Sequence, residues 1–275
     1  MGGSFLEDVK NSKIEKLIRE NLSLNDTILD LEDKGVTLED LKQLLLSDSA
    51  GPVEKLFLSN NRLGDDEIEL LCESGAFKNL RDLYLNNNNI GDRGGRALAN
   101  ATFAPNLTCL MLEANNLGPD GARALSNAPN LKKLETLFLD SNPIGAEGAM
   151  ALGNSASLPA LKALHLDSTQ IGDEGLQALV CTPLMGQLTK LYLCSNKITD
   201  AGMRALADSP RSQNLVILSV WRNEIRDDGG MAIAESKNLG KLERLYMSLN
   251  LIDKPVRKMI RQSELASRLS TLVMD

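Results

Sequence analysis

Apolar residues recur along the chain at a fixed spacing, and this spacing indicates how the chain is built. Leucines stand 27 positions apart from residue 29 to residue 272, without insertion or deletion: Leu29, Leu56, Leu83, Leu110, Leu137, Leu164, Leu191, Leu218, Leu245 and Leu272. Around them lies the pattern L-x-x-L-x-L-x-x-N-x-(I/L), followed by a short segment rich in Gly and Ala. A fixed period of about 20–50 residues predicts stacked copies of one supersecondary unit instead of a globule with one central core.

The apolar spacing within one repeat predicts a short strand. Leu83 and Leu85 are two residues apart, so a strand would direct both to one side and Tyr84 to the other. A further aliphatic residue follows from repeat to repeat and would form an apolar column inside the stack. Its members are Leu63, Ile90, Leu117, Ile144, Ile171, Ile198, Ile225 and Ile252.

One polar position within the repeat is almost always Asn. Its members are Asn61, Asn88, Asn115, Asn142, Thr169, Asn196, Asn223 and Asn250. A buried amide costs free energy unless its groups are hydrogen-bonded, so we expect a ladder of side chains bonded to backbone groups of adjacent repeats. Thr169 has fewer bonding groups than Asn, and we expect a weaker rung there.

The second half of each repeat predicts a thin helix. Short side chains suited to an N-cap stand at Gly91-Asp92, Gly172-Asp173 and Thr199-Asp200. Gly disfavours a helix by about 1 kcal/mol relative to Ala, so its recurrence in the first turn indicates a close backbone approach. These glycines are Gly94, Gly121, Gly148, Gly175, Gly202 and Gly229.

This pattern resembles the leucine-rich repeat family, and more narrowly its ribonuclease-inhibitor-like class with bacterial-type repeats of 27 residues. The resemblance covers about residues 26–275. It implies an α/β leucine-rich-repeat solenoid, a horseshoe with a parallel sheet on the concave face and helices on the convex face. It implies no particular partner, because the family binds many unrelated ones.

The ends of the chain depart from the repeat. We expect an N-terminal helical cap over residues 1–25, repeats over residues 26–268 with a degenerate first one, and a half-repeat with an edge strand over residues 269–275. The cap is predicted from the helical spacing of Phe5, Leu6, Val9, Ile14, Leu17 and Ile18. This segment could instead be a docking element for a second protein. Pro255 predicts a helix start near residues 256–260.

Composition narrows the classes of function. A net charge of −7 argues against nucleic acid as the main partner. No apolar run is long enough to span a membrane, and the N-terminus lacks a secretory signal pattern. The four cysteines, Cys72, Cys109, Cys181 and Cys194, fall in repeats too far apart to pair, which predicts free thiols in a reducing compartment. We expect a cytoplasmic monomer, or alternatively a secreted effector without a classical signal peptide.

Aromatic residues concentrate at the middle position of the predicted strands. All 3 Tyr and the only His of the chain stand there. The stripe consists of Phe57, Tyr84, Met111, Phe138, His165, Tyr192 and Tyr246, and Trp221 lies two residues further along its strand on the same face. Such a stripe could stack on itself without a ligand. It could equally be a contact surface, since interfaces are enriched in Tyr, Trp and Met.

A second column, two residues past the stripe, carries three consecutive carboxylates. These are Glu113, Asp140 and Asp167. They would form a solvated acidic rim, a pocket for a partner bearing Lys or Arg, or, with less support from a single His, a metal site. On the other flank Cys109, Thr136 and Ala163 would give a groove a small floor.

No catalytic constellation is present: a Ser-His-Asp triad would have to use His165, and no nucleophile elbow, P-loop or Cys-x-x-Cys site occurs. We therefore expect a non-enzymatic module, without cofactor, that binds a protein or a basic-apolar peptide on its concave face. The alternatives are a secreted bacterial effector that binds a host protein and a small-ligand or metal-binding module.

Overall fold

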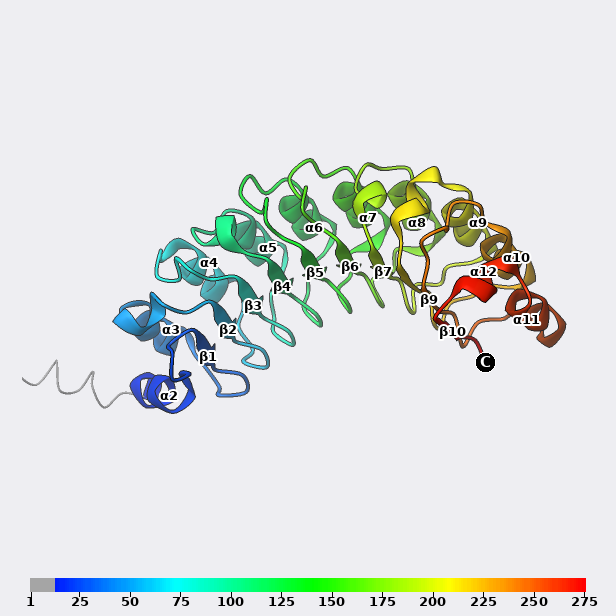
Figure 1. The fold of residues 1–275 in the computed structure, drawn as a ribbon. Helices are drawn as coiled ribbons and strands as arrows, with labels where there is room; N and C mark the ends of the chain where they lie inside the picture. Colours follow the sequence, from blue (N-terminus) through cyan, green and yellow to red (C-terminus); the bar gives the residue numbers. More distant parts are fainter. Residues whose placement is uncertain (1–12) are drawn as a thin grey trace, which may run out of the picture.

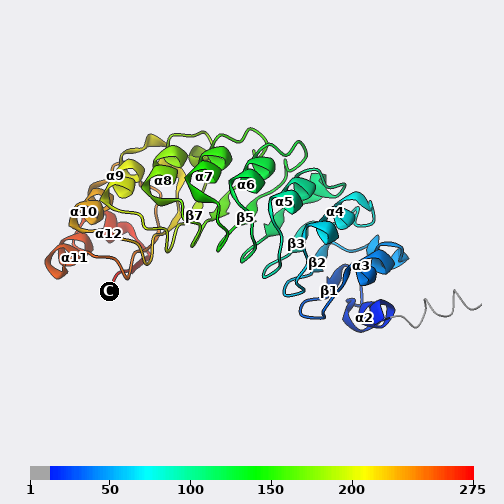
Figure 2. The same ribbon diagram turned by 180° about the vertical axis from the view of Figure 1, so that it is seen from behind.

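The chain forms a curved stack of repeats in the computed structural model, which describes residues 13–275. Ten parallel strands form one sheet in the order of the sequence. Both views of the ribbon place the helices along the outer side of the arc, with the sheet on the inner side (Figures 1 and 2). The predicted α/β solenoid with a concave parallel sheet is thus confirmed.

Each strand is three residues long, and each pairs with the next at the offset of 27 seen in the sequence, as in the pairing of Leu83 with Leu110. The strands are β1 (Ile28–Asp30), β2 (Lys55–Phe57), β3 (Asp82–Tyr84), β4 (Cys109–Met111), β5 (Thr136–Phe138), β6 (Ala163–His165), β7 (Lys190–Tyr192), β8 (Ile217–Ser219), β9 (Arg244–Tyr246) and β10 (Thr271–Val273).

The helices are also short, because each repeat leaves room for only about two helical turns between one strand and the next. They are α2 (Lys13–Asn21), α3 (Leu38–Leu45), α4 (Asp65–Glu73), α5 (Asp92–Ala99), α6 (Pro119–Ser126), α7 (Gly145–Gly153), α8 (Gly172–Val180), α9 (Asp200–Asp208), α10 (Asp227–Glu235), α11 (Lys254–Arg261) and α12 (Glu264–Arg268). Single 3₁₀ turns occur at η1 (Asp48–Ala50), η2 (Ala104–Asn106), η3 (Met185–Gln187) and η4 (Pro210–Asn214).

The core runs as a continuous apolar column through the stack. Leu83, Leu85 and Ile90 are completely buried, as are their counterparts in the central repeats. The Asn ladder is present as well: Asn142 donates to the carbonyl oxygens of Leu112 and Leu139 and accepts from the Leu117 N–H. Each rung therefore ties two adjacent repeats together.

Thr169 weakens the ladder in the predicted way. Its hydroxyl donates to Leu166 O at 2.6 Å and contacts Asn196 Oδ1 at 3.2 Å. It offers no amide oxygen to the preceding repeat, where the Ile144 N–H donates to Asn142 O instead. Gly145, which directly follows Ile144, has a φ of +63°, a value that favours glycine.

The helix starts are capped from the neighbouring repeat, which differs from the prediction. Asp92 lies in the first turn of α5, and its Oδ1 accepts from the N–H groups of Gly118 and Gly121 at the start of α6, both at 2.7 Å. A Cβ on Gly121 would lie 2.8 Å from this oxygen, so the close approach at this glycine is to a carboxylate. At Gly175 the close approach is to backbone, as predicted, because a Cβ would lie 3.1 Å from Ala146 Cα. Capping within the same helix occurs at Thr199, whose hydroxyl accepts from the Ala201 N–H. The equivalent contact to the next repeat is made by Asp65, Asp173, Asp200 and Asp227.

The two ends of the stack are covered to different degrees. Helix α2 buries Ile14 and Ile18 against the first repeat; Phe5, Leu6 and Val9 of the predicted cap lie outside the described residues. Helix α11 begins at Lys254 with Pro255 in its first turn, as predicted, and the short α12 follows. Strand β10 is the last in the sheet, and Leu272 on it is only partly buried.

Candidate binding surface on the concave face

The last residue of each strand, directly after the buried leucine, lies on the open face of the sheet. Phe57, Tyr84, Met111, Phe138, His165, Tyr192 and Tyr246 are all half-buried there. Trp221 is exposed, with 42% of its surface accessible. The strand register places these residues in one row, which Ser219 interrupts between Tyr192 and Tyr246.

Several rings of the row stack on one another. His165 lies between Phe138 and Tyr192, with ring centroids 3.8 Å and 4.1 Å away. Phe57 and Tyr84 stack in the same way at 4.0 Å. Adjacent parallel strands are about 4.8 Å apart, which brings rings at equivalent positions into contact. Part of the row therefore stacks on itself, as one of the two interpretations of the sequence expects. These side chains nevertheless remain partly accessible to solvent.

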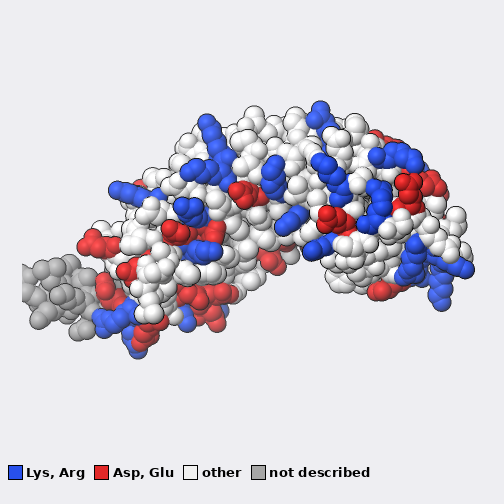
Figure 3. Space-filling model, viewed as in Figure 1, with Lys and Arg blue, Asp and Glu red and all other residues white. Residues whose placement is uncertain are grey.

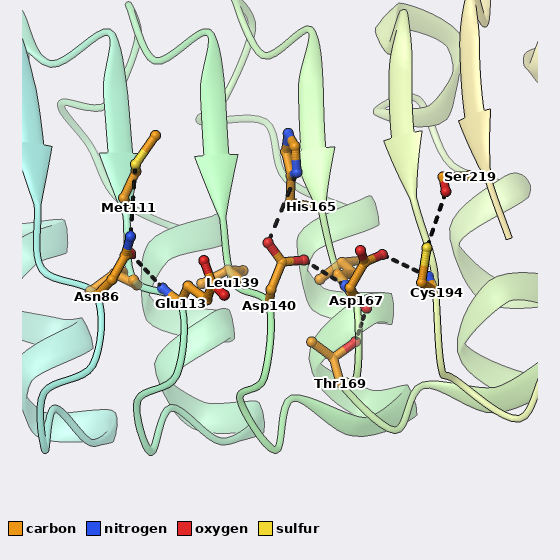
Figure 4. Close-up of polar contacts among 12 residues, drawn as sticks. Asn86, Met111, Glu113, Leu139, Asp140, His165, Asp167, Thr169, Cys194 and Ser219 are labelled. Atoms are coloured by element: carbon orange, nitrogen blue, oxygen red, sulfur yellow. Dashed lines mark hydrogen bonds and ion pairs between the residues drawn. The ribbon is translucent and has the colours of Figure 1, made fainter. Parts of the chain in front are cut away.

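The acidic column has a structural role that the sequence pattern did not reveal. Asp140 Oδ1 accepts from the Asp167 N–H at 2.6 Å, and Asp167 Oδ1 accepts from the Cys194 N–H at 2.6 Å (Figure 4). Asn86 Oδ1 accepts from the Glu113 N–H in the same manner. These contacts form a second ladder at the ends of the strands, on the concave side of the Asn ladder.

The three carboxylates differ in how far they are exposed to solvent. Glu113 is exposed, whereas Asp140 is only 9% exposed and Asp167 is half-buried. A solvated rim therefore describes Glu113 and does not describe Asp140. Asp140 and Asp167 nevertheless lie on the same open face as His165, as Figure 4 shows.

The buried position changes the protonation of these groups. The pKa of Asp140 is raised to about 7, mainly by burial and to a lesser extent by the neighbouring charges of Asp167 and Glu113, against the lowering effect of the Asp167 N–H. Burial also raises the pKa of Asp167. For His165, burial and the nearby Lys190 charge lower the pKa to about 4. The His165 ring is thus neutral near pH 7, and its Nδ1 lies 3.9 Å from Asp140 Oδ2.

The other flank of the row has the predicted small centre and basic ends. Cys109 and Thr136 are half-buried and Ala163 is buried, while Lys190 and Arg244 are exposed. Toward the N-terminal end, Lys55 pairs with Asp82 at 2.9 Å. The centre of the concave face thus carries an aromatic row between a small-residue flank and an acidic flank. All four cysteines are free.

Two further properties of residues 13–275 bear on the alternatives. No group of three or more His, Cys, Asp or Glu side chains is placed to hold a metal ion, so the metal interpretation of the acidic column has no geometric support. None of the helices in this part of the chain is long and apolar enough to cross a bilayer.

Comparison with protein families agrees with the geometry. Residues 78–99, 103–126, 130–153, 158–180, 188–207 and 211–234 match the family described as Leucine Rich repeat. The chain belongs to the leucine-rich repeat family. Each matched segment contains one strand and all or nearly all of the helix that follows it. Together the segments cover the six central repeats, from β3 to α10. No curated protein matches the chain. Leucine-rich repeat domains are generally scaffolds for protein interaction and are typically not enzymes.

Proposed function

We propose that the concave face binds a protein or peptide, with the aromatic row as the main contact and Glu113, Asp140 and Asp167 beside it. The observation that carries the proposal is the half-buried row of stacked rings, together with the exposed Trp221 two residues past the Ser219 position. Rings held by stacking lose little side-chain entropy on binding, because their rotamers are already restricted.

The two flanks favour a partner segment that is both apolar and basic. The acidic flank carries the exposed carboxylate of Glu113 and the accessible edge of Asp167. The other flank leaves room at Thr136 and Ala163 for a side chain of the partner. A Lys or Arg side chain can lay its methylene stem over aromatic rings and bring its charge to a carboxylate.

Loss of a proton from Asp140 would accompany such binding. An approaching cation favours the charged form of a carboxyl, so it lowers a pKa that burial has raised to about 7. Binding of a basic segment is therefore expected to release a proton near neutral pH and to be stronger at pH 8 than at pH 6.

Affinity capture from a cell lysate tests the proposal. The bait is the full chain, and the test variant carries Phe138→Ala, Tyr192→Ala and Trp221→Ala together. We expect the parent to capture a protein that the variant loses by at least about tenfold, because aromatic anchors dominate interface energies.

The matched control places three substitutions on the convex helices: Arg123→Ala, Met150→Ala and Gln177→Ala, all at exposed residues. Circular dichroism and thermal unfolding verify that both variants fold. Equal capture by the concave variant and the parent, or a loss confined to the convex control, would show that the concave row is not the binding surface.

A further inference from the structure

Exposed apolar side chains of the described residues gather at the two ends of the stack. Large apolar residues with more than a third of their surface accessible are Leu24, Ile28 and Leu46 at the N-terminal end and Leu249, Leu251, Met259 and Val273 at the C-terminal end. Between the ends only Met150 and Trp221 are exposed to this degree. Leucines at positions 249 and 251 are unusual, because the equivalent positions of the preceding repeats are Arg222 and Glu224, and Ser195 and Lys197.

The C-terminal end carries a group of cations on α11. Lys254, Arg257, Lys258 and Arg261 lie within about a third of a turn on one side of α11, given 100° per residue. None of them forms an ion pair within residues 13–275, and Arg261 donates to the Met274 carbonyl oxygen. Figure 3 shows this basic group at the end of the arc, over α11.

Some cations elsewhere in the stack do form ion pairs: Lys13 pairs with Asp40, Lys55 with Asp82, and Arg204 with Asp228. Others, such as those on Lys132 and Lys162, form none among the described residues, so the C-terminal group is distinguished by four such cations on one helix that also exposes Met259. A cation beside exposed aliphatic side chains, without a carboxylate partner in its own chain, is typical of a surface that contacts another molecule.

The N-terminal end has the opposite charge. Asp26, Asp30, Glu32 and Asp33 are all exposed around β1, next to the exposed Leu24 and Ile28. No ion pair among the described residues includes any of these four carboxylates. From Lys13 to Gly75 the chain holds 15 acidic and 7 basic residues, whereas residues 240–275 hold 4 acidic and 7 basic residues.

We propose that these ends bind each other between two copies of this chain, in a head-to-tail contact. The tail surface consists of Leu249, Leu251 and the basic side of α11. The head surface consists of Leu24, Ile28 and the four carboxylates around β1. Each surface combines aliphatic groups with exposed charge that is mostly of one sign, despite Lys34 in the head surface and Asp253 beside the tail surface. The two prevailing signs are opposite, which makes the surfaces complementary to one another.

The last strand of the described sheet leaves part of its apolar surface accessible. Leu269 and Leu272 are only partly buried, although their counterparts Leu242 and Leu245 are buried. A second copy seated on this end would remove that apolar surface from water, which favours association by about 25 cal/mol per Å². A contact between unlike ends is heterologous, so it extends to longer assemblies at high concentration instead of stopping at a dimer. The proposed contact differs from the expectation of a monomer and does not involve the concave row.

Sedimentation velocity of the full chain tests the proposal. At low salt we expect the average mass to rise with protein concentration above that of one chain. In about 1 M NaCl, where the Debye length falls to about 3 Å, we expect the mass to decrease toward that of one chain. A parent that stays monomeric at low salt over the whole accessible concentration range overturns the proposal.

Two neutralised variants locate the contact. The tail variant carries Lys254→Gln, Arg257→Gln and Lys258→Gln, and the head variant carries Asp26→Asn, Asp30→Asn and Asp33→Asn. Each alone should associate about tenfold more weakly than the parent, because several exposed ion pairs are lost at once. An equimolar mixture should recover association that stops at dimers, since each variant keeps one intact surface.

The control variant Lys132→Gln, Lys133→Gln and Lys162→Gln removes three exposed cations from the central repeats and should associate like the parent. Thermal unfolding verifies that all variants fold. A head variant that associates like the parent indicates contact between like ends, and a mixture that recovers nothing excludes a contact between unlike ends; either result overturns the proposal. The concave variant Phe138→Ala, Tyr192→Ala and Trp221→Ala should associate like the parent, which separates this inference from the proposed function.

Discussion

The effect of Asp140 on the free energy of unfolding depends on pH, because its buried carboxyl is costly to ionise. Its carboxyl is nearly buried, and its pKa is raised to about 7 from an ordinary value near 3.8. The folded state therefore binds more protons than the unfolded state between these two values. The stabilising contribution of this group is fully present below about pH 4 and is lost as the pH rises through about 7.

The substitution Asp140→Asn tests this assignment. The amide keeps an oxygen that can accept from the Asp167 N–H and carries no charge at any pH. We expect the variant to be more stable than the parent by about 1–3 kcal/mol at pH 8 and to approach the parent at pH 4. Urea unfolding at both pH values measures the difference.

A difference between the two proteins that is the same at pH 4 and pH 8 would contradict the raised pKa. His165 titrates in the opposite sense, since its pKa is lowered to about 4 and its stabilising contribution is lost as the pH falls. This effect is common to both proteins and largely cancels in their difference. Glu113→Gln serves as the control, because it removes an exposed charge from the same column.

The sequence predicted structural positions best for residues that play the same part in every repeat. Leu83, Ile90 and Asn88 have the positions that their spacing indicated, because burial in a stack demands the same side chain at the same place in each repeat. The buried position of Asp140 could not be predicted. A carboxylate on the solvent side of a strand is expected to be hydrated, and only the backbone geometry past the strand shows that it accepts an N–H from the next repeat.

At the scale of the helix, each start depends on the preceding repeat. Asp92 belongs to α5 but satisfies two N–H groups at the start of α6. A helix N-terminus has unpaired donors and a partial positive charge, so a carboxylate at this point stabilises it. The contact also links neighbouring helices on the convex side, where the strands cannot link them.

Asp92→Ala should therefore destabilise the protein by about 1–2 kcal/mol, the usual cost of losing an N-cap. The matched control is Asp120→Ala, in the first turn of α6, whose exposed carboxylate pairs with Arg123. We expect the control to cost about 0–1 kcal/mol, as for other surface ion pairs. Chemical denaturation of both variants measures the two values, and an equal loss in both would contradict capping between repeats.

The sequence indicated that Gly and Asp mark helix starts, but not which helix each Asp caps. Spacing along one chain makes a cap within the same helix the simpler interpretation, and only the lateral stacking of repeats brings Asp92 to Gly118. Pro119 and Ala146 take the place of this Asp in α6 and α7. The following helices, α7 and α8, begin instead with Gly145 and Gly172 at φ values of +63° and +58°.

At the scale of the whole molecule, one repeat length determines the architecture. Because every repeat has the same number of residues, equivalent side chains align in rows across the sheet, and a row of rings or charges becomes a surface. The concave row was accordingly predictable from the sequence. The exposure of its members was not, since it depends on how closely neighbouring rings stack. The uneven charge of the two ends likewise became informative only when the structure showed which cations have no carboxylate partner.

Site-specific photo-crosslinking to a captured partner tests the central claim, that the concave face is the binding surface, most directly. A photoreactive phenylalanine replaces Tyr192 on the concave row in one protein and Gln177 on the convex helix α8 in another. The proposal predicts a crosslinked partner from position 192 and none from position 177. Crosslinking from position 177 alone would contradict it and would assign binding to the convex helices.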